Sequence, residues 1–217
     1  MAITLSTGAT VSVAKTYAPS ITFSTITNAA AAIITTSAAH SITVGDYVEI
    51  SSGWGLLDKR VVRAATGTTG SSLTLEGVDT TDLVKYPAGT GGGSVRRITA
   101  WTALSQIKSV SASGGSQNFA NITSITDTVE RQVPTTRAAV QMTIDAYDDP
   151  TLSWYADVTA ADVSRTPYGL LMAFPNGSKL AANAYWSLQR VPTMATNEAL
   201  MSQITLSYAS EPIRYSV

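Results

Sequence analysis

The 217-residue chain has a formal net charge of −1, and only 13% of its residues are charged, so its exterior must be polar but largely uncharged. It contains no cysteine and a single histidine, which excludes disulfides, thiolate nucleophiles and paired-histidine metal sites. Its Lys and Arg residues form no basic stripe, which disfavours specific nucleic-acid binding, and no apolar run reaches membrane-spanning length.

A Thr- and Ser-rich exterior suits a protein that contacts other proteins, because burying a hydroxyl costs less than burying a charge. Secreted β-proteins share this composition, so composition alone leaves both classes open. The N-terminus has no basic region followed by an apolar one, and we therefore expect no signal peptide. Together these features predict a soluble protein that is made and assembled in the cytoplasm.

The first 28 residues alternate small, polar and β-branched side chains, and the pattern predicts strands at Thr10–Val13 and Ile21–Thr27. The alanine run Ala29–Ala32 is short and flanked by β-branched residues, so we expect strand or loop rather than helix. Short strands separated by glycine turns follow, at residues 47–50, 60–64, 72–75 and 94–98. They predict a small barrel-like β module, inserted as residues 29–98 into a β-domain built from residues 1–28 and 99–217.

The segment after the module begins with a predicted strand at Trp101–Ser109. Ser111–Pro134 has little periodicity and many small polar residues, which predicts a long mobile loop. The next stretch, Arg137–Ala146, alternates between two faces. Its apolar face holds Ala138, Val140, Met142 and Ile144, and its polar face holds Arg137, Gln141, Thr143 and Asp145.

One flanking α-helix is expected over about residues 150–164. Asp149 suits an N-cap, Pro150 suits the first helical position, and apolar residues recur near helical spacing. The dipeptide Thr166-Pro167 ends the helix.

Three antiparallel strands are predicted after the helix, within Tyr168–Ser178, Lys179–Arg190 and Leu200–Ala209. The turn Phe174-Pro-Asn-Gly177 joins the first two. Each strand has an apolar and a polar face. The fold class is therefore mainly β, an antiparallel β-sandwich or barrel with one helix.

No catalytic constellation stands out, so we expect no enzyme, no metal and no cofactor. His40 precedes a turn without any nucleophile motif, and Gly89–Gly93 lacks the context of a phosphate-binding loop. The three aspartates Asp145, Asp148 and Asp149 match no calcium-loop spacing, and helix capping explains Asp149 better. Trp54, in a Ser/Gly loop, is the tryptophan placed to be exposed.

The order of features from about Thr99 onward resembles the tail tube (major tail) proteins of long-tailed bacteriophages. A long loop leads to a strand ending in Asp-Asp-Pro, a helix, a strand entering Phe-Pro-Asn-Gly, and two strands closing on Glu-Pro. The resemblance lies in Ile144–Pro150, Phe174–Ser178, Ala182–Gln189 and Met201–Pro212. The segments Ala39–Val48, Asp79–Thr81 and Gly91–Val95 are similar to a module inserted in some of these proteins.

The resemblance implies a structural virion protein with a tail-tube β-domain. Six copies would close into a ring, and rings would stack into the tube through which DNA passes without specific contacts. The implied partners are other copies of the chain, a tape measure protein, and tail tip and terminator proteins, with no membrane. The implied location is the virion tail, assembled in the host cytoplasm.

The same resemblance assigns roles to particular residues. Subunit contacts would come from the loop at Ser113, Gly114, Gly115, Asn118 and Phe119. A wet channel wall would hold the polar strand residues Arg137, Gln141, Thr143 and Lys179. Deleting Gly114–Asn121 is expected to leave the fold intact and abolish polymerisation.

A receptor- or glycan-binding β-module on a virion surface is the alternative. It would explain the Thr- and Ser-rich strands and an exposed Trp54. Such a module would be a monomer or trimer with a measurable ligand, whereas a tube subunit would form rings or hollow tubes.

Overall fold

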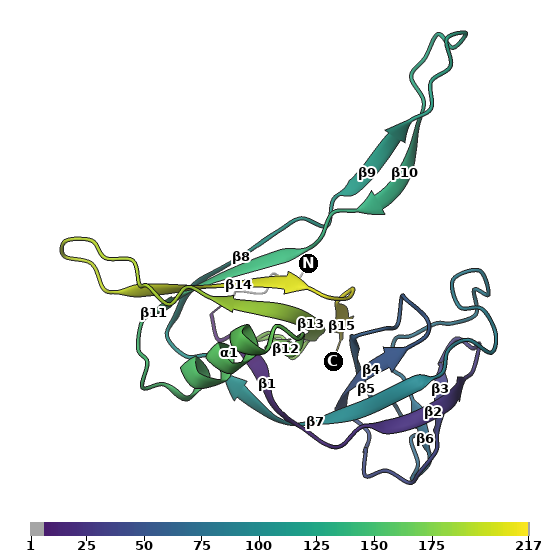
Figure 1. Cartoon of the computed structure of the whole chain (residues 1–217), viewed down its shortest axis with the longest axis horizontal. Coiled ribbons are helices and arrows are strands. Elements are labelled where there is room, and N and C mark those ends of the chain that lie inside the picture. Colours follow the sequence, from purple (N-terminus) through teal and green to yellow (C-terminus); the bar gives the residue numbers. More distant parts are fainter. Residues whose placement is uncertain (1–6, 217) are drawn as a thin grey trace.

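The computed structural model describes residues 7–216, which form fifteen strands and one helix (Figure 1). The first strands are β1 (Thr10–Tyr17), β2 (Ile21–Ile26), β3 (Ile33–Thr36), β4 (Tyr47–Ser52), β5 (Arg60–Arg63), β6 (Ser72–Thr74), β7 (Gly93–Ala103) and β8 (Ile107–Ser113). The remaining elements are β9 (Gln117–Asn121), β10 (Gln132–Arg137), β11 (Gln141–Tyr147), α1 (Ser153–Ser164), β12 (Tyr168–Ala173), β13 (Lys179–Leu188), β14 (Met201–Tyr208) and β15 (Ile213–Tyr215).

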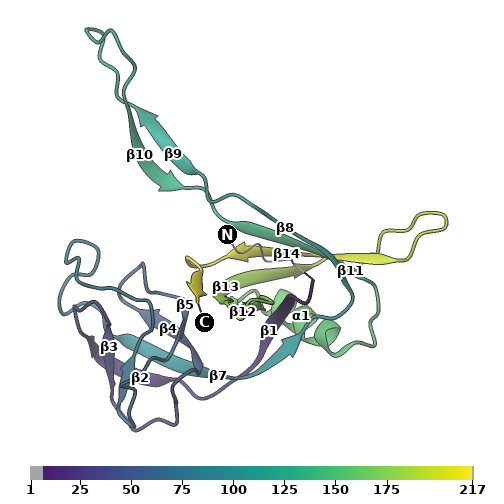
Figure 2. The same ribbon diagram turned by 180° about the vertical axis from the view of Figure 1, so that it is seen from behind.

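The main sheet is antiparallel, with strand order β7-β1-β12-β13-β14-β11-β8. Helix α1 lies against one face of it (Figures 1 and 2). The predicted mainly β, antiparallel fold with one helix is confirmed. The predicted hairpin is also confirmed, since β12 and β13 pair in register and the Phe174 N–H donates to the Ser178 carbonyl oxygen. Gly177 takes the positive φ of 81° that this turn requires.

Side-chain alternation explains the face on which the helix packs. Met142 and Ile144 of β11 lie opposite Leu206 and Ile204 of β14, and all four are buried. Trp154, Val158 and Ala161 of α1 pack onto this apolar face. Burial of this one face leaves the opposite face free for polar residues.

The module has its own core, centred on Ile34, Ile50, Leu57 and Leu73. Its strands run in the order β6-β3-β2-β7-β4-β5, and an isolated bridge between Ala64 and Leu75 brings the last strand back to the first. The module is therefore barrel-like without a continuous ladder.

The module and the main sheet share elements. Strand β7 runs from the module into the main sheet, and β2, which precedes residue 29, pairs within the module. Ala181, Ile213 and Tyr215 of the main sheet complete the module's core. The Tyr215 hydroxyl accepts a hydrogen bond from the Arg63 N–H at 2.8 Å, so β15 holds the module against the sheet.

Helix α1 begins three residues later than the expected first helical position, and Asp149 is not its N-cap. The Asp149 carboxylate instead accepts hydrogen bonds from the N–H and hydroxyl of Thr151, at 3.0 and 2.6 Å. Leu152 holds the N-cap position with extended backbone and no side-chain hydrogen bond. Burial of Trp154 replaces capping as the feature that fixes this end.

The segment Ser111–Pro134 is not an irregular loop, as the sequence suggested. Its first residues continue β8, and β9 and β10 form a two-stranded ribbon that projects away from the main sheet (Figure 1). Cross-strand pairs Phe119–Pro134 and Ala120–Val133 set its register. Interspersed Asn and Thr residues hide the period of two. A proline inside the run also argues against a central strand, but each strand of a two-stranded ribbon has one unpaired edge, where proline is tolerated.

A second difference concerns Trp101–Ser109, expected as one strand. Strand β7 ends at Ala103 and β8 starts at Ile107, with Gln106 at a φ of 60° between them. This turn moves the chain from one edge of the main sheet to the other.

Candidate assembly surface

The face of the main sheet opposite α1 is polar over β8, β11, β14 and the second half of β13. Besides Tyr147 and Met201 at its end, the register places eleven polar side chains there, and we call this set of eleven the polar face: Ser109, Ser111, Ser113, Gln141, Thr143, Asp145, Tyr185, Ser187, Gln203, Thr205 and Ser207. Each is exposed or half-buried. The other half of this side of the sheet is covered by the module.

Asp145 is the one charged residue among these eleven. Its carboxylate accepts hydrogen bonds from the Ser109 hydroxyl at 2.7 Å and the Gln203 amide at 3.1 Å. The Ser109 bond, followed by the Gln203 bond, holds the pKa of Asp145 below the usual value of an aspartic acid. Two ammonium groups border the face, because Lys59 lies 3.4 Å from the Tyr185 hydroxyl and Lys108 lies 3.6 Å from the Met201 sulfur.

The four residues expected to line a channel fall in three places. Gln141 and Thr143 lie on the polar face, opposite Ser207 and Thr205. Arg137 ends β10 and lies 3.8 Å from Glu211, away from the centre of the face. Lys179 starts β13, beside Tyr215 of β15, at the far end of the strand from Ser187.

The sequence missed the serines of β8 and the polar residues of β14. In β8 the available signal is the alternation of Ser109, Ser111 and Ser113. This alternation can be recognised as one face of a strand only when the pairing of β8 with β11 is known.

Strand β8 is an edge of the main sheet. It pairs with β11 on one side, and within residues 7–216 no strand pairs with its other side. Its burial pattern is exposed at six of seven positions. An exposed edge with small side chains offers free N–H and C=O groups to another chain.

The ribbon of β9 and β10 contains the expected contact residues Asn118 and Phe119, while Ser113, Gly114 and Gly115 form its base. A Cβ on Gly114 would lie 2.0 Å from the Ala139 oxygen, and its φ is 83°, so only glycine fits. The ribbon leaves the main sheet at this point, and Gly114 therefore sets its direction.

The ribbon exposes apolar side chains that belong to neither hydrophobic core of residues 7–216. Five large ones are at least 39% exposed: Phe119, Ile122, Ile125, Val129 and Val133. Phe119 pairs with Pro134 on one face and Ala120 pairs with Val133 on the other, so both faces are apolar. A two-stranded ribbon is marginally stable by itself, and an exposed apolar surface of this kind marks a protein contact.

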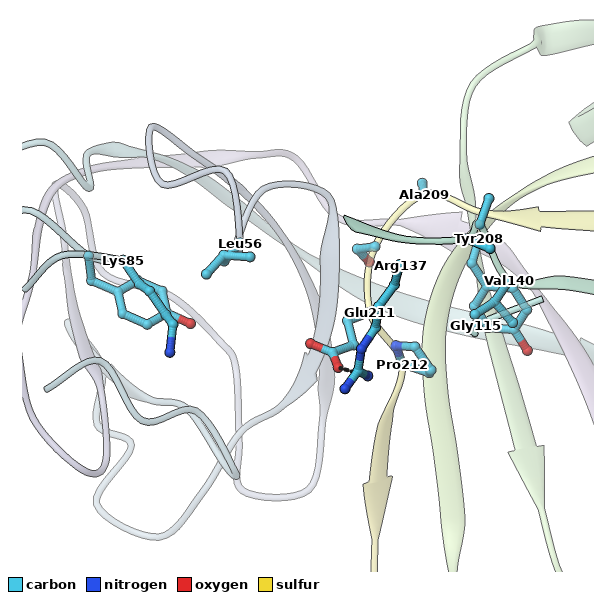
Figure 3. A pocket seen from close by; sticks show the side chains of 13 residues that line it. Leu56, Lys85, Gly115, Arg137, Val140, Tyr208, Ala209, Glu211 and Pro212 are labelled. Atoms are coloured by element: carbon cyan, nitrogen blue, oxygen red, sulfur yellow. Dashed lines mark ion pairs between the residues drawn. The ribbon is translucent and has the colours of Figure 1, made fainter. Parts of the chain in front are cut away.

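A cleft of about 720 Å³ lies at the base of the ribbon, between the module and the main sheet (Figure 3). Leu56, Lys85 and Tyr86 form its module side. Its sheet side combines the end of β14 and the following turn with the base of the ribbon and the residues that lead into β11: Gly115, Arg137, Ala138, Ala139, Val140, Tyr208, Ala209, Ser210, Glu211 and Pro212. The walls combine apolar and polar groups, and the Arg137–Glu211 ion pair lies on the sheet side (Figure 3).

Trp54 is buried, contrary to the expectation from its Ser/Gly loop. Only 2% of it is exposed, and its ring meets Tyr86 edge-on. Its indole N–H donates to the Pro87 carbonyl oxygen and the Thr90 hydroxyl oxygen, at 2.9 and 3.0 Å. Gly91 packs directly on the ring, where a Cβ would lie 2.8 Å away. The tryptophan is therefore a core residue of the module and offers no stacking surface.

The remaining candidate groups have local partners. His40 Nδ1 accepts from the Ile42 N–H at 3.3 Å, and Asp148 accepts from the Ser202 hydroxyl at 2.5 Å. Within residues 7–216, no three His, Asp or Glu side chains gather as metal ligands. No helix of that part of the chain is both long and apolar enough to cross a bilayer.

Comparison with known proteins gives one family match. The model of the family described as "Phage tail tube protein, TTP" matches residues 52–217, which include the polar face, the ribbon and the cleft. No curated protein matches. Among solved structures, the tube-terminating cap of the anti-feeding prophage shares 23% identity at a TM-score of 0.37, over 49% of this chain and 79% of that chain. The anti-feeding prophage baseplate shares 8% identity at a TM-score of 0.40, over 55% and 87%.

Proposed function

We propose that this chain, which belongs to the phage tail tube protein family, closes as six copies into a ring and that the rings stack into the conduit for DNA ejection. Family membership makes the chain a structural component of the phage tail. The polar face is the observation that best supports the finer proposal, because a sheet with one wet and one packed face suits the wall of a water-filled tube.

The polar face is proposed as the channel lining, with α1 and the module outside it. DNA passes freely only if the wall does not bind its phosphates, and Lys or Arg side chains are the groups that do so. The eleven residues of the polar face include neither, and they include one carboxylate. Gln141 and Thr143 belong to this lining, whereas Arg137 and Lys179 are proposed to lie at its borders.

Ring closure is proposed to use the free edge of β8. Pairing this edge with a strand of the next copy continues the sheet across the subunit boundary and removes an edge prone to aggregation. A ring of such sheets forms a closed barrel that a single copy does not contain.

Contact between successive rings is proposed to use the ribbon. Its apolar residues, Phe119 among them, belong to neither core of the described chain, and the ribbon projects away from the main sheet (Figure 1). Apolar side chains on both faces suit a ribbon enclosed between other subunits. Asn118 and the base residues Ser113, Gly114 and Gly115 would position it.

The remaining partners follow from the same proposal. A tape measure protein would occupy the channel before DNA does, and tip and terminator proteins would cover the two ends of the tube. Assembly is proposed to take place in the host cytoplasm, with no catalytic step by this chain. The glycan-binding alternative loses its main support, because Trp54 is buried.

Thiol labelling tests the channel assignment, and the cysteine-free chain permits single cysteines at chosen positions. A cysteine replacing Thr143, on the polar face, is expected to react with a small and a large maleimide in the free subunit, and with the small one alone in assembled tubes. A cysteine replacing Val163, 64% exposed on α1, is expected to react with both reagents in both states. Labelling of position 143 in tubes by the large reagent would contradict the proposal.

A further inference from the structure

The hairpin between β13 and β14 exposes apolar side chains at the opposite end of the main sheet from the cleft. This segment, residues 189–200, is called the tip (Figure 1). Val191 and Met194 are 70% and 73% exposed. A bridge between Thr193 and Met201, with N–O distances of 2.8 and 3.3 Å, closes the hairpin at the base of the loop that carries Met194.

The tip and the cleft are the two ends of one strand. The tip precedes Met201, and β14 runs 8 residues to Tyr208, which lines the cleft. At the rise of an antiparallel strand, this places them roughly 25 Å apart along the sheet. A projection at one end and a recess at the other match in a head-to-tail contact rather than across a two-fold axis, and repetition of that contact along the strand direction stacks the copies.

The chemistry of the two surfaces is complementary. The cleft is lined by apolar groups such as Leu56, Val140 and Pro212, and the tip offers Val191 and Met194. The cleft lining holds two cations and one anion. Lys85 is paired with Asp82 at 3.0 Å and Arg137 with Glu211 at 3.8 Å, and such exposed pairs are weak enough to accept a second carboxylate. On the tip, Arg190 is engaged by Asp162 of α1 at 3.2 Å, which leaves Glu198 as the outward charge.

We infer that the tip of one copy docks into the cleft of the copy in the next ring, with Met194 among the apolar cleft residues and Glu198 facing Lys85 and Arg137. The inference rests on the proposed stacking of rings and adds a second contact to that of the ribbon. Each copy contributes a tip at one end and a cleft at the other, so the contact repeats without limit along the tube. The module then acts in assembly as well, because Leu56 and Lys85 form one wall of the recess.

Disulfide trapping in the cysteine-free chain tests the contact. Tubes of the double variant Met194→Cys/Leu56→Cys are expected to give, on mild oxidation, a ladder of covalent multimers. Tubes mixed from the two single variants are expected to give dimers only, since each subunit then has one thiol. A matched control, Met194→Cys/Val44→Cys, moves the second thiol to an exposed module residue outside the cleft lining and is expected to stay monomeric.

Electron microscopy of the same samples separates this inference from the proposed function. Tubes that form normally but give no ladder with the double variant, or an equal ladder with the control, would overturn the inference and leave the tube proposal standing. Failure of the unmodified chain to form rings or tubes, even with preformed tail tips added as nuclei, would overturn both. Met194→Asp, which places a charge in the apolar recess, is expected to reduce tube formation roughly tenfold while the subunit keeps its unfolding midpoint.

Discussion

Apolar side chains are buried in the module core and exposed in the ribbon. Around Ile34, Ile50 and Leu73, apolar side chains of the module are enclosed by their own chain. In the ribbon, Phe119 and Ile125 point away from any core, with 59% and 105% exposure. Residues of the same β-branched and aromatic types therefore stabilise the subunit in the module core but remain exposed in the ribbon, where another subunit can cover them. Folding and assembly are separable properties of this chain, and substitutions should divide between them.

The largest expected effect on folding comes from Trp154→Ala. Trp154 is fully buried between α1 and the main sheet, so its removal leaves a cavity and lowers the free energy of unfolding by about 3–5 kcal/mol. Denaturant titration followed by circular dichroism measures the change. A loss below about 1 kcal/mol would show that α1 contributes little to the core.

The largest expected effect on assembly comes from replacing residues 117–137 by a short Gly linker, which removes the whole ribbon. The backbone bond from the Gly115 N–H to the Ala138 carbonyl keeps the two ends close, so the main sheet should retain its unfolding midpoint. Polymerisation should be lost, as read by negative-stain microscopy. Normal tubes would contradict the role of the ribbon. Deleting only Gly114–Asn121 is a less clean test, because it removes β9 and leaves β10 without its pairing strand.

A smaller change, Phe119→Ala, should act on assembly alone. Because Phe119 touches no core, the free energy of unfolding should stay within about 0.5 kcal/mol of the original. Loss of an aromatic anchor should weaken subunit association roughly tenfold. Light scattering during polymerisation measures the second quantity. An equal effect on unfolding and on assembly would remove the distinction between the two regions.

Gly114→Ala should redirect the ribbon without touching its apolar surface. The new Cβ would collide with the Ala139 oxygen, so the backbone at the ribbon base must move. Polymerisation should fall while the unfolding midpoint shifts little. Ser116→Ala, which leaves Gly114 and Gly115 unchanged, serves as the matched control. Tubes of normal yield would show that the direction of the ribbon is set elsewhere.

The smallest expected effect concerns Ser109→Ala on the polar face. Ser109 donates to Asp145, so its loss should raise the pKa of Asp145 toward the usual aspartate value. A depressed pKa stabilises the folded state above the unfolded pKa, and this contribution disappears as the pH falls through the folded pKa. The two proteins should therefore differ slightly at neutral pH and converge in acid. An NMR titration of the Asp145 carboxyl measures the shift, and an unchanged pKa would contradict the assignment.

The sequence predicted the strands that follow a strict period of two and the turn at Phe174–Gly177, because alternation and turn chemistry are local signals. It failed at Asp149, whose carboxylate prefers Thr151 over the helix, and at Trp54, whose burial depends on the distant residues Tyr86 and Thr90. The failure at Trp54 involves hydrogen-bond partners that only the folded chain brings together, whereas the partner of Asp149 lies two residues away and competes locally with helix capping.

Only the part of the candidate surface that lies within a single strand was predictable from the sequence. Gln141 and Thr143 stand out in one alternating strand, whereas the polar face needs the register between β11, β14 and β8. The cleft was not predictable, since its walls at Leu56 and Tyr208 come from segments about 150 residues apart.

Cryo-electron microscopy of the purified, polymerised chain tests the central claim most directly. The proposal predicts stacked six-fold rings, with the polar face of β8, β11, β13 and β14 around the channel and α1 on the outside. A map with α1 lining the channel, or particles without a closed ring, would contradict it.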